Sequence, residues 1–147
     1  MWFDHFEAIA KEFEGFSLKT YRDPVGYPTQ GYGHLLSRDK SLPLSTWPDI
    51  TEAQAKEWLE NDAKNAKRAV NRLCPGVTRD TQIAALTDFT FNLGAGYLEI
   101  STLRKRINRG ENPTVDPNEF MKWVYAGGVK YSGLVRRRRA ETELWNS

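Results

Sequence analysis

The chain has 147 residues, 27% of them charged, and a formal net charge of only +2, which gives weak support for a polyanionic partner. Five Trp, seven Phe and six Tyr can build the core of a single compact domain. Cys74 is the only cysteine and excludes an internal disulfide, and two histidines are too few for a histidine-rich metal site. We therefore expect no cofactor and no metal.

The first twelve residues carry ionisable side chains at five positions: Asp4, His5, Glu7, Lys11 and Glu12. This pattern is unlike a signal peptide or a membrane anchor, so we expect no signal peptide and no stable membrane insertion. A lone thiol also fits a protein that is made and folded in a reducing cytoplasm.

The first predicted element is an amphipathic helix over residues about 4–14. Apolar side chains recur there at helical spacing, and Gly15 is the expected stop. Glu14 lies in the last turn, facing the negative end of the helix dipole and flanked by Phe13 and Phe16. These surroundings disfavour a carboxylate, so Glu14 is placed to hold a proton.

A β-hairpin is predicted next. Polar and apolar side chains alternate over residues 17–21, which predicts a strand. Asp23-Pro24-Val25-Gly26 carries the preferred residues of a type I turn, and residues 29–34 are expected to form the returning strand. Asp23, at an open polar turn, should stay ionised. Two carboxyls in unlike surroundings, with the hydroxyl of Thr29 nearby, are typical of glycoside hydrolases. Taken separately, a Glu before a Gly and an Asp before a Pro are also ordinary helix-end and turn residues.

A long helix over residues 51–73 follows, starting with the capping-box sequence Thr51-Glu52-Ala53-Gln54. At about 1.5 Å per residue it would span roughly 33 Å, enough to link two lobes. We expect a mainly α-helical, two-lobed lysozyme-type fold in one domain, 1–147. Its small lobe, about 12–55, bears the hairpin, and its helical lobe comprises 76–147 plus the N-terminal helix.

Four helices are expected within residues 76–147. A buried helix over 80–93 ends at Gly94, and Ser101 caps a short basic helix that ends near Gly110. Asp116-Pro117-Asn118-Glu119 predicts a helix that reaches Tyr125, and a last helix runs from Ser132 towards Trp145.

The segment from Glu14 to His34 resembles the active-site signature of the phage lysozymes related to T4 lysozyme, glycoside hydrolase family 24. The later blocks look closest to endolysins of lambdoid-type phages. Residues that match the signature are Glu14, Gly15, Leu18, Tyr21, Asp23, Gly26, Thr29, Gly31, Tyr32, Gly33 and His34; later matching blocks are 91–94, 101–103, 123–128 and 133–134. The segment 38–49 is shorter than its counterpart in T4 lysozyme. The resemblance therefore does not establish the second half of the sheet in the small lobe, whereas the catalytic segment is unaffected.

The resemblance implies an endolysin that hydrolyses the β-1,4 bond between N-acetylmuramic acid and N-acetylglucosamine in bacterial peptidoglycan, with inversion. Glu14 would be the general acid that protonates the leaving oxygen, and Asp23 and Thr29 would hold and activate the water that attacks the sugar. The enzyme would stay in the host cytoplasm until a phage holin opened the membrane and released it to the wall in the periplasm. We expect a monomer.

The resemblance also implies supporting residues. Leu35, Phe91, Thr102 and Trp123 match positions that line the sugar-binding groove, although Phe91 and Trp123 read alone would be core residues. His34 matches a histidine that pairs with an aspartate on the linking helix, here Asp62. Of the four arginines 136–139, at least one should face inward, since consecutive helical residues point in different directions. We assign that position to Arg136, beside the catalytic Glu.

Three other readings are open. A lytic transglycosylase also cuts peptidoglycan but works from a Glu without a partnered Asp. A wall-binding module without activity would have lost the acid, whereas Glu14 and Asp23 are both present. A nucleic-acid-binding protein would explain the arginine run, but the chain has no recognisable docking module, so we expect no nucleic-acid partner.

Overall fold

Two compact units divide the chain in the computed structural model, which describes all residues from 1 to 147. One unit combines Met1–Ile9 with Ala63–Ser147, and the other is Ala10–Asp62. We call them the helical unit and the hairpin unit. Helices α1 (Trp2–Glu14) and α2 (Glu52–Leu73) contribute residues to both. The fold is mainly helical, with small sheets, as expected.

Both of these helices start and stop close to the predicted residues. Gly15, at φ +69°, ends α1 in the left-handed conformation that glycine tolerates best. At the start of α2 the hydroxyl of Thr51 accepts the backbone N–H of Gln54 at 3.2 Å, which satisfies one free donor of the first turn. None of the helices is both long and apolar enough to cross a membrane.

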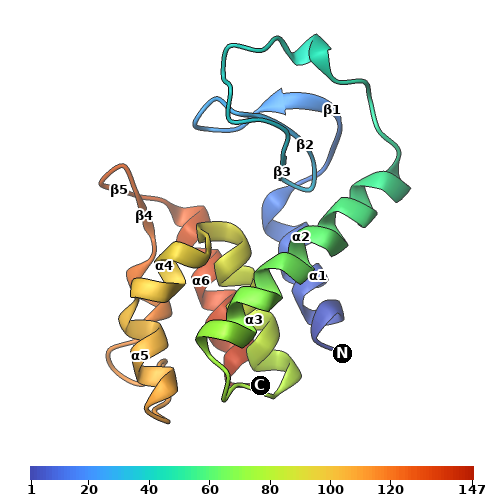
Figure 1. The fold of residues 1–147 in the computed structure, drawn as a ribbon. Helices are drawn as coiled ribbons and strands as arrows, with labels where there is room; N and C mark the ends of the chain where they lie inside the picture. The colour runs from blue at the N-terminus through green and yellow to red at the C-terminus, as the bar shows by residue number, and fades with distance from the viewer. The chain divides into compact units, whose positions relative to one another are not determined.

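The hairpin unit is built on an antiparallel sheet in the order β1-β2-β3 (Figure 1). Its strands are β1 (Ser17–Arg22), β2 (Pro28–Gly31) and β3 (His34–Leu35). The third strand is present although the segment after it is short. The Arg22 guanidinium organises that segment by donating to the carbonyls of Lys40 and Leu42, each at 3.0 Å. A 3-10 turn, η1 (Leu44–Thr46), follows.

The core of the helical unit forms around α3 (Asp80–Leu93), which packs against α4 (Ala95–Ile100) and α6 (Ser132–Trp145) (Figure 1). The buried side chains of this core are Val70, Leu73, Cys74, Ala85, Leu86, Phe89, Leu98, Leu103, Phe120 and Trp145. Burial raises the pKa of the Cys74 thiol to about 11, against the opposing charge of Arg104, so the thiol stays protonated at neutral pH.

One prediction for this unit was wrong, and one helix was not predicted. No α-helix covers 116–125: the Asn118 side chain accepts the N–H of Phe120 at 3.0 Å, and only a short 3-10 turn, η2 (Phe120–Lys122), forms. A hairpin of β4 (Tyr125–Ala126) and β5 (Val129–Lys130) follows, turning at Gly127-Gly128. Gly94 ends α3 as predicted, but α4, which we had not predicted, follows it directly and precedes the predicted short basic helix, α5 (Thr102–Asn108).

Candidate active site

Glu14 is the last residue of α1, and its carboxyl packs against the backbone of a neighbouring turn. A Cβ atom at Gly33 would lie 3.1 Å from Glu14 Cδ and would collide with Oε2. Gly33 has φ +69°, so its conformation also favours glycine. The glycine therefore makes room for the carboxyl group at the end of the helix.

Asp23 occupies the turn between β1 and β2, as predicted. Its Oδ1 accepts three backbone N–H groups, from Val25 at 3.0 Å and from Gly26 and Tyr27 at 2.8 Å each. No hydrogen bond or ion pair within the protein engages Oδ2. The turn thus fixes the carboxylate through one oxygen and leaves the other available.

Thr29 lies on β2 directly opposite Tyr21 of β1, so their side chains share one face of the sheet. Thr29 is buried, and its hydroxyl donates to the carbonyl of Tyr27 at 2.9 Å. Burial raises the pKa of Tyr21, and the negative charges of Glu14 and Asp23 raise it further. Both carboxyls therefore lie near enough to the Tyr21 hydroxyl for their charges to influence its pKa.

The hairpin unit accordingly brings Glu14, Asp23 and Thr29 together around Tyr21. We had not assigned Tyr21 to the site. Its position two residues before Asp23 on a strand could have indicated a shared face. Two carboxyls, one on a helix end and one on a turn, beside a fixed hydroxyl, can supply an acid and a base to one bond.

His34 and Asp62 form the contact that we predicted, with His34 Nδ1 2.7 Å from Asp62 Oδ2. The imidazole also stacks on Trp58, with ring centroids 4.4 Å apart and an interplanar angle of 29°. This pair joins β3 to α2 inside the hairpin unit.

The four residues expected to bind sugar fall in different units. Leu35 lies on β3 in the hairpin unit and is 37% exposed. Phe91, Thr102 and Trp123 belong to the helical unit. Phe91 packs edge-on against Phe6, with centroids 5.3 Å apart, and Trp123 makes similar contacts with Phe89 and Tyr97.

The α6 arginines that point into the protein are not the one that we predicted. Arg136 is exposed, whereas Arg137 and Arg138 are buried, so the inward position assigned to Arg136 was wrong. Arg137 donates two hydrogen bonds to Asp88 of α3, Nε to Oδ2 at 2.9 Å and Nη2 to Oδ1 at 2.8 Å. Residues 137 and 138 are the ones that α6 turns toward α3.

Asp88 and Glu141 form a buried acidic pair within this cluster. Arg138 Nε lies 2.9 Å from Glu141 Oε1, and Arg138 Nη2 donates to Asn92 at 2.7 Å. Burial opposes ionisation of Asp88, but hydrogen bonds from Glu141 and Arg137 outweigh it and hold the pKa of Asp88 below its usual value. Burial and the hydrogen bond to Asp88 raise the pKa of Glu141 well above 4.5, so Glu141 is the partner that keeps a proton.

The hydrolysis that the resemblance implies should fall about 100-fold in a Gly33→Ala variant, because the new methyl group displaces the Glu14 carboxyl and a misplaced catalytic group costs about that much. Initial rates on purified peptidoglycan, with thermal unfolding in parallel, measure the effect. Gly15→Ala is the matched control, since Gly15 has the same φ of +69° but nothing within 4 Å of the added atom. Equal rates for the two variants would contradict the proposed packing.

Known phage proteins resemble this chain in sequence and in fold. Residues 11–141 match the family described as phage lysozyme. A relative from Bacteriophage PS119, named SAR-endolysin, is 35% identical over 134 residues, covering 90% of this chain and 77% of that protein. The endolysin of Bacillus phage B103 is 35% identical over 139 residues, 93% of this chain, and this chain spans about half (51%) of its length. A solved endolysin from Escherichia coli O157:H7 phage FAHEc1 has 31% identity and a TM-score of 0.80, with 96% and 89% of the two chains covered.

The mainly helical fold is that of a lysozyme-type glycoside hydrolase. The chain belongs to the phage lysozyme family.

Proposed function

We propose that this protein is an endolysin that hydrolyses the β-1,4 bond between N-acetylmuramic acid and N-acetylglucosamine in bacterial peptidoglycan, with inversion. The observation that carries the proposal is the grouping of Glu14, Asp23 and Thr29 around Tyr21 in one unit. Glu14 gives its proton to the leaving glycosidic oxygen. Asp23 removes a proton from the water that attacks the opposite face of the sugar.

The hydrogen bonds of the hairpin support this assignment of the water. Because Thr29 already donates to Tyr27, its oxygen can only accept from a bound water. Asp23 Oδ2 is the second acceptor. A water that donates one proton to each has its lone pairs directed away from the protein, toward an anomeric carbon. The two acceptors thus orient the nucleophile while Asp23 activates it.

The remaining residues have supporting roles in the proposal. Leu35, Phe91, Thr102 and Trp123 contact the sugar chain, and His34 with Asp62 holds β3 on α2. Since Arg136 is exposed, we assign it no part in placing Glu14.

The route to the wall is part of the same proposal. We infer that the chain acts as a monomer and depends on a holin to cross the inner membrane. Expression of this chain alone in intact cells tests the route: lysis should require an added membrane-permeabilising step. Spontaneous lysis without one would contradict holin dependence and leave the hydrolytic activity untouched.

The ends of the released fragments test the reaction. Purified protein acting on isolated peptidoglycan should generate new reducing ends on N-acetylmuramic acid, which borohydride reduction and mass spectrometry detect. A lytic transglycosylase would instead leave anhydro ends, because it closes the sugar on itself without adding water. Anhydro products would overturn the proposal.

A further inference from the structure

The helical unit carries a positive charge that the balance of the whole chain conceals. It holds 15 of the 21 Lys and Arg and 10 of the 19 Asp and Glu, a net of +5, so the hairpin unit has a net of −3. An excess of this size on one unit favours an anionic partner there. Arg137 and Arg138 of α6 contribute little to this surface charge, because both are buried beside acidic groups.

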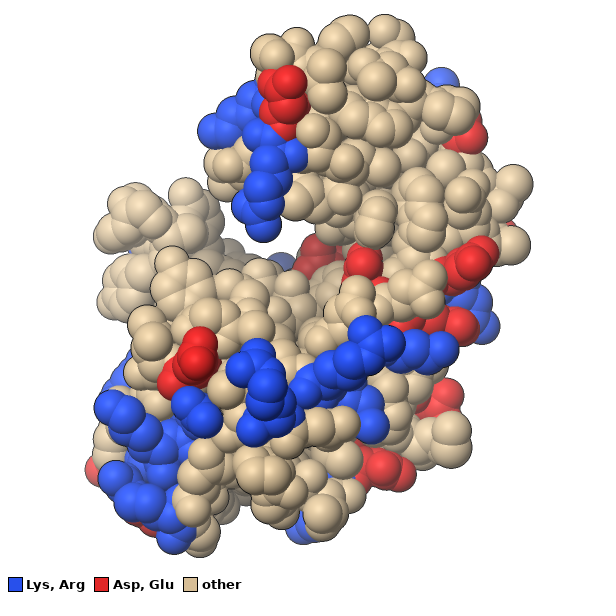
Figure 2. All heavy atoms as spheres, viewed as in Figure 1, with Lys and Arg blue, Asp and Glu red and all other residues tan.

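Three of the basic residues of the helical unit form a row along the second half of α2. Lys64, Arg68 and Arg72 follow one another at four-residue spacing, so they share one helix face, and all three are exposed. We call these three residues the basic row. Figure 2 shows Lys and Arg gathered over this part of the surface.

None of the three residues of the basic row forms an ion pair, and Arg68 donates only to the neutral side chain of Asn65. Like charges at this spacing repel one another and destabilise a helix. A ligand that neutralises them removes this repulsion.

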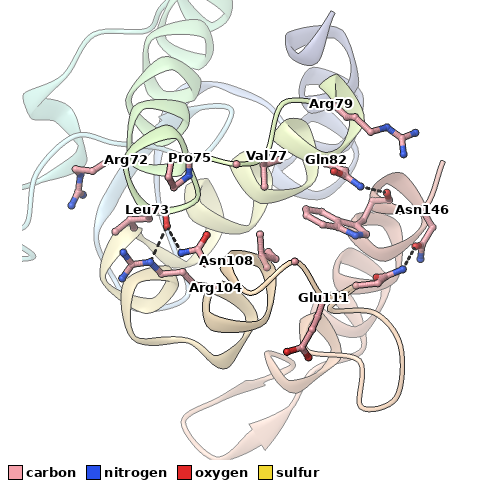
Figure 3. A pocket seen from close by; sticks show the side chains of 15 residues that line it. Arg72, Leu73, Pro75, Val77, Arg79, Gln82, Arg104, Asn108, Glu111 and Asn146 are labelled. Carbon is pink, nitrogen blue, oxygen red and sulfur yellow. Dashed lines mark hydrogen bonds between the residues drawn. The ribbon is translucent and has the colours of Figure 1, made fainter.

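The row ends at a cavity of about 800 Å³ in the helical unit. Arg72, Arg79 and Arg104 line it, and its only acidic lining residue, Glu111, is already paired with Arg106 and Arg109. Figure 3 shows Arg72 and Arg79 on opposite sides of the cavity.

Not every basic group at the cavity is available. Arg104 Nε and Asn108 Nδ2 both donate to the carbonyl of Leu73 at 2.9 Å and so close the C-terminal end of α2 (Figure 3). Arg79 donates to the carbonyl of Ser147 at 2.6 Å. The indole of Trp145 also lines the cavity and is 5% exposed, yet its N–H donates no hydrogen bond. Arg72 and this N–H remain for a ligand.

We propose that the basic row and the adjoining cavity bind a linear phosphodiester polymer of the bacterial cell envelope. Charges spaced about 6 Å apart along a helix match a chain of repeated anions better than one compact anion. The exposed residues between the row's members are Asn65 and Asn71, with no aromatic ring on which nucleic-acid bases could stack. The choice of an envelope polymer rests on the proposed function, because that function brings the protein to the wall.

Binding of lipid-free poly(glycerol phosphate) tests the proposal, measured by titration with the indole N–H resonance of Trp145 followed by NMR. We expect Arg68→Glu/Arg72→Glu to weaken binding at least 10-fold and to reduce its salt dependence. Arg68→Gln/Arg72→Gln should weaken it in the same direction with less disturbance of the helix. Lys130→Glu/Arg139→Glu is the matched control: it changes the net charge equally, at exposed positions of the same unit outside the row.

Three results would overturn the proposal. The control variant could lose as much affinity as the row variant, which would mean that net charge alone acts. Single-stranded DNA of equal charge could bind as tightly, which would indicate an unselective polyanion surface. The Trp145 resonance could stay unmoved at saturation. Hydrolysis of peptidoglycan stripped of the polymer keeps this test separate from the proposed function: it should be equal in the wild type and the row variant, and its absence in both would refute only the enzymatic proposal.

Discussion

A Glu14→Gln variant should fold normally and lose about 1000-fold or more of its hydrolytic rate. Glutamine keeps the size of the side chain at the end of α1 but has no proton to transfer, and general acid catalysis contributes about 10²–10⁴-fold. Initial rates on purified peptidoglycan, with circular dichroism and thermal unfolding in parallel, measure both quantities.

Glu12→Gln is the control for this change. Glu12 is exposed on the same helix two residues earlier, so the substitution removes one carboxylate without touching the site. Its rate should equal that of the wild type. Full activity in a folded Glu14→Gln protein would remove the proposed acid.

The second large effect concerns stability. Asp88→Asn should lower the free energy of unfolding by about 3–5 kcal/mol, because it breaks the buried ion pair in which Arg137 donates two hydrogen bonds to the Asp88 carboxylate. Glu141→Gln should change it by only about 1 kcal/mol at neutral pH, since an amide resembles the protonated carboxyl and can still donate to Asp88. Chemical denaturation of the three proteins gives the comparison.

Asp88 and Glu141 should also give the free energy of unfolding opposite dependences on pH. The lowered pKa of Asp88 means that its stabilising contribution is present above its ordinary value of 3.8 and is lost as the pH falls through the folded value. The raised pKa of Glu141 means that its contribution is present below 4.5 and is lost as the pH rises through the folded value. Glu141→Gln should therefore remove the loss of stability at rising pH and keep the loss at falling pH. An unchanged loss at rising pH in this variant would refute a protonated Glu141.

Sequence patterns predicted the parts of the fold that local chemistry determines. The capping Thr51 with the apolar spacing after it gave both ends of α2, and Asp23-Pro24-Val25-Gly26 gave the turn of the first hairpin. The contact of His34 with Asp62 came from the resemblance and is present at 2.7 Å. These features depend on residues close in sequence or on a shared signature.

Features that depend on distant packing were missed. Asp116-Pro117-Asn118-Glu119 has the residues of a helix start, but Glu119 is buried and bound by Arg106 and Lys122, which holds the segment in another conformation. Arg136 was chosen among four neighbours that local sequence cannot distinguish. Arg137 is buried where it binds Asp88, an aspartate within an apolar helix.

The anomeric form of the first product tests the central claim most directly. If Glu14 acts from one side while Asp23 and Thr29 deliver water from the other, cleavage of the β-bond releases the α-anomer first. Proton NMR of a soluble peptidoglycan fragment, recorded before mutarotation, should show this α-anomer. The β-anomer appearing first would mean a covalent intermediate on a carboxylate, and the assignment of Asp23 and Thr29 as holders of the water would be wrong.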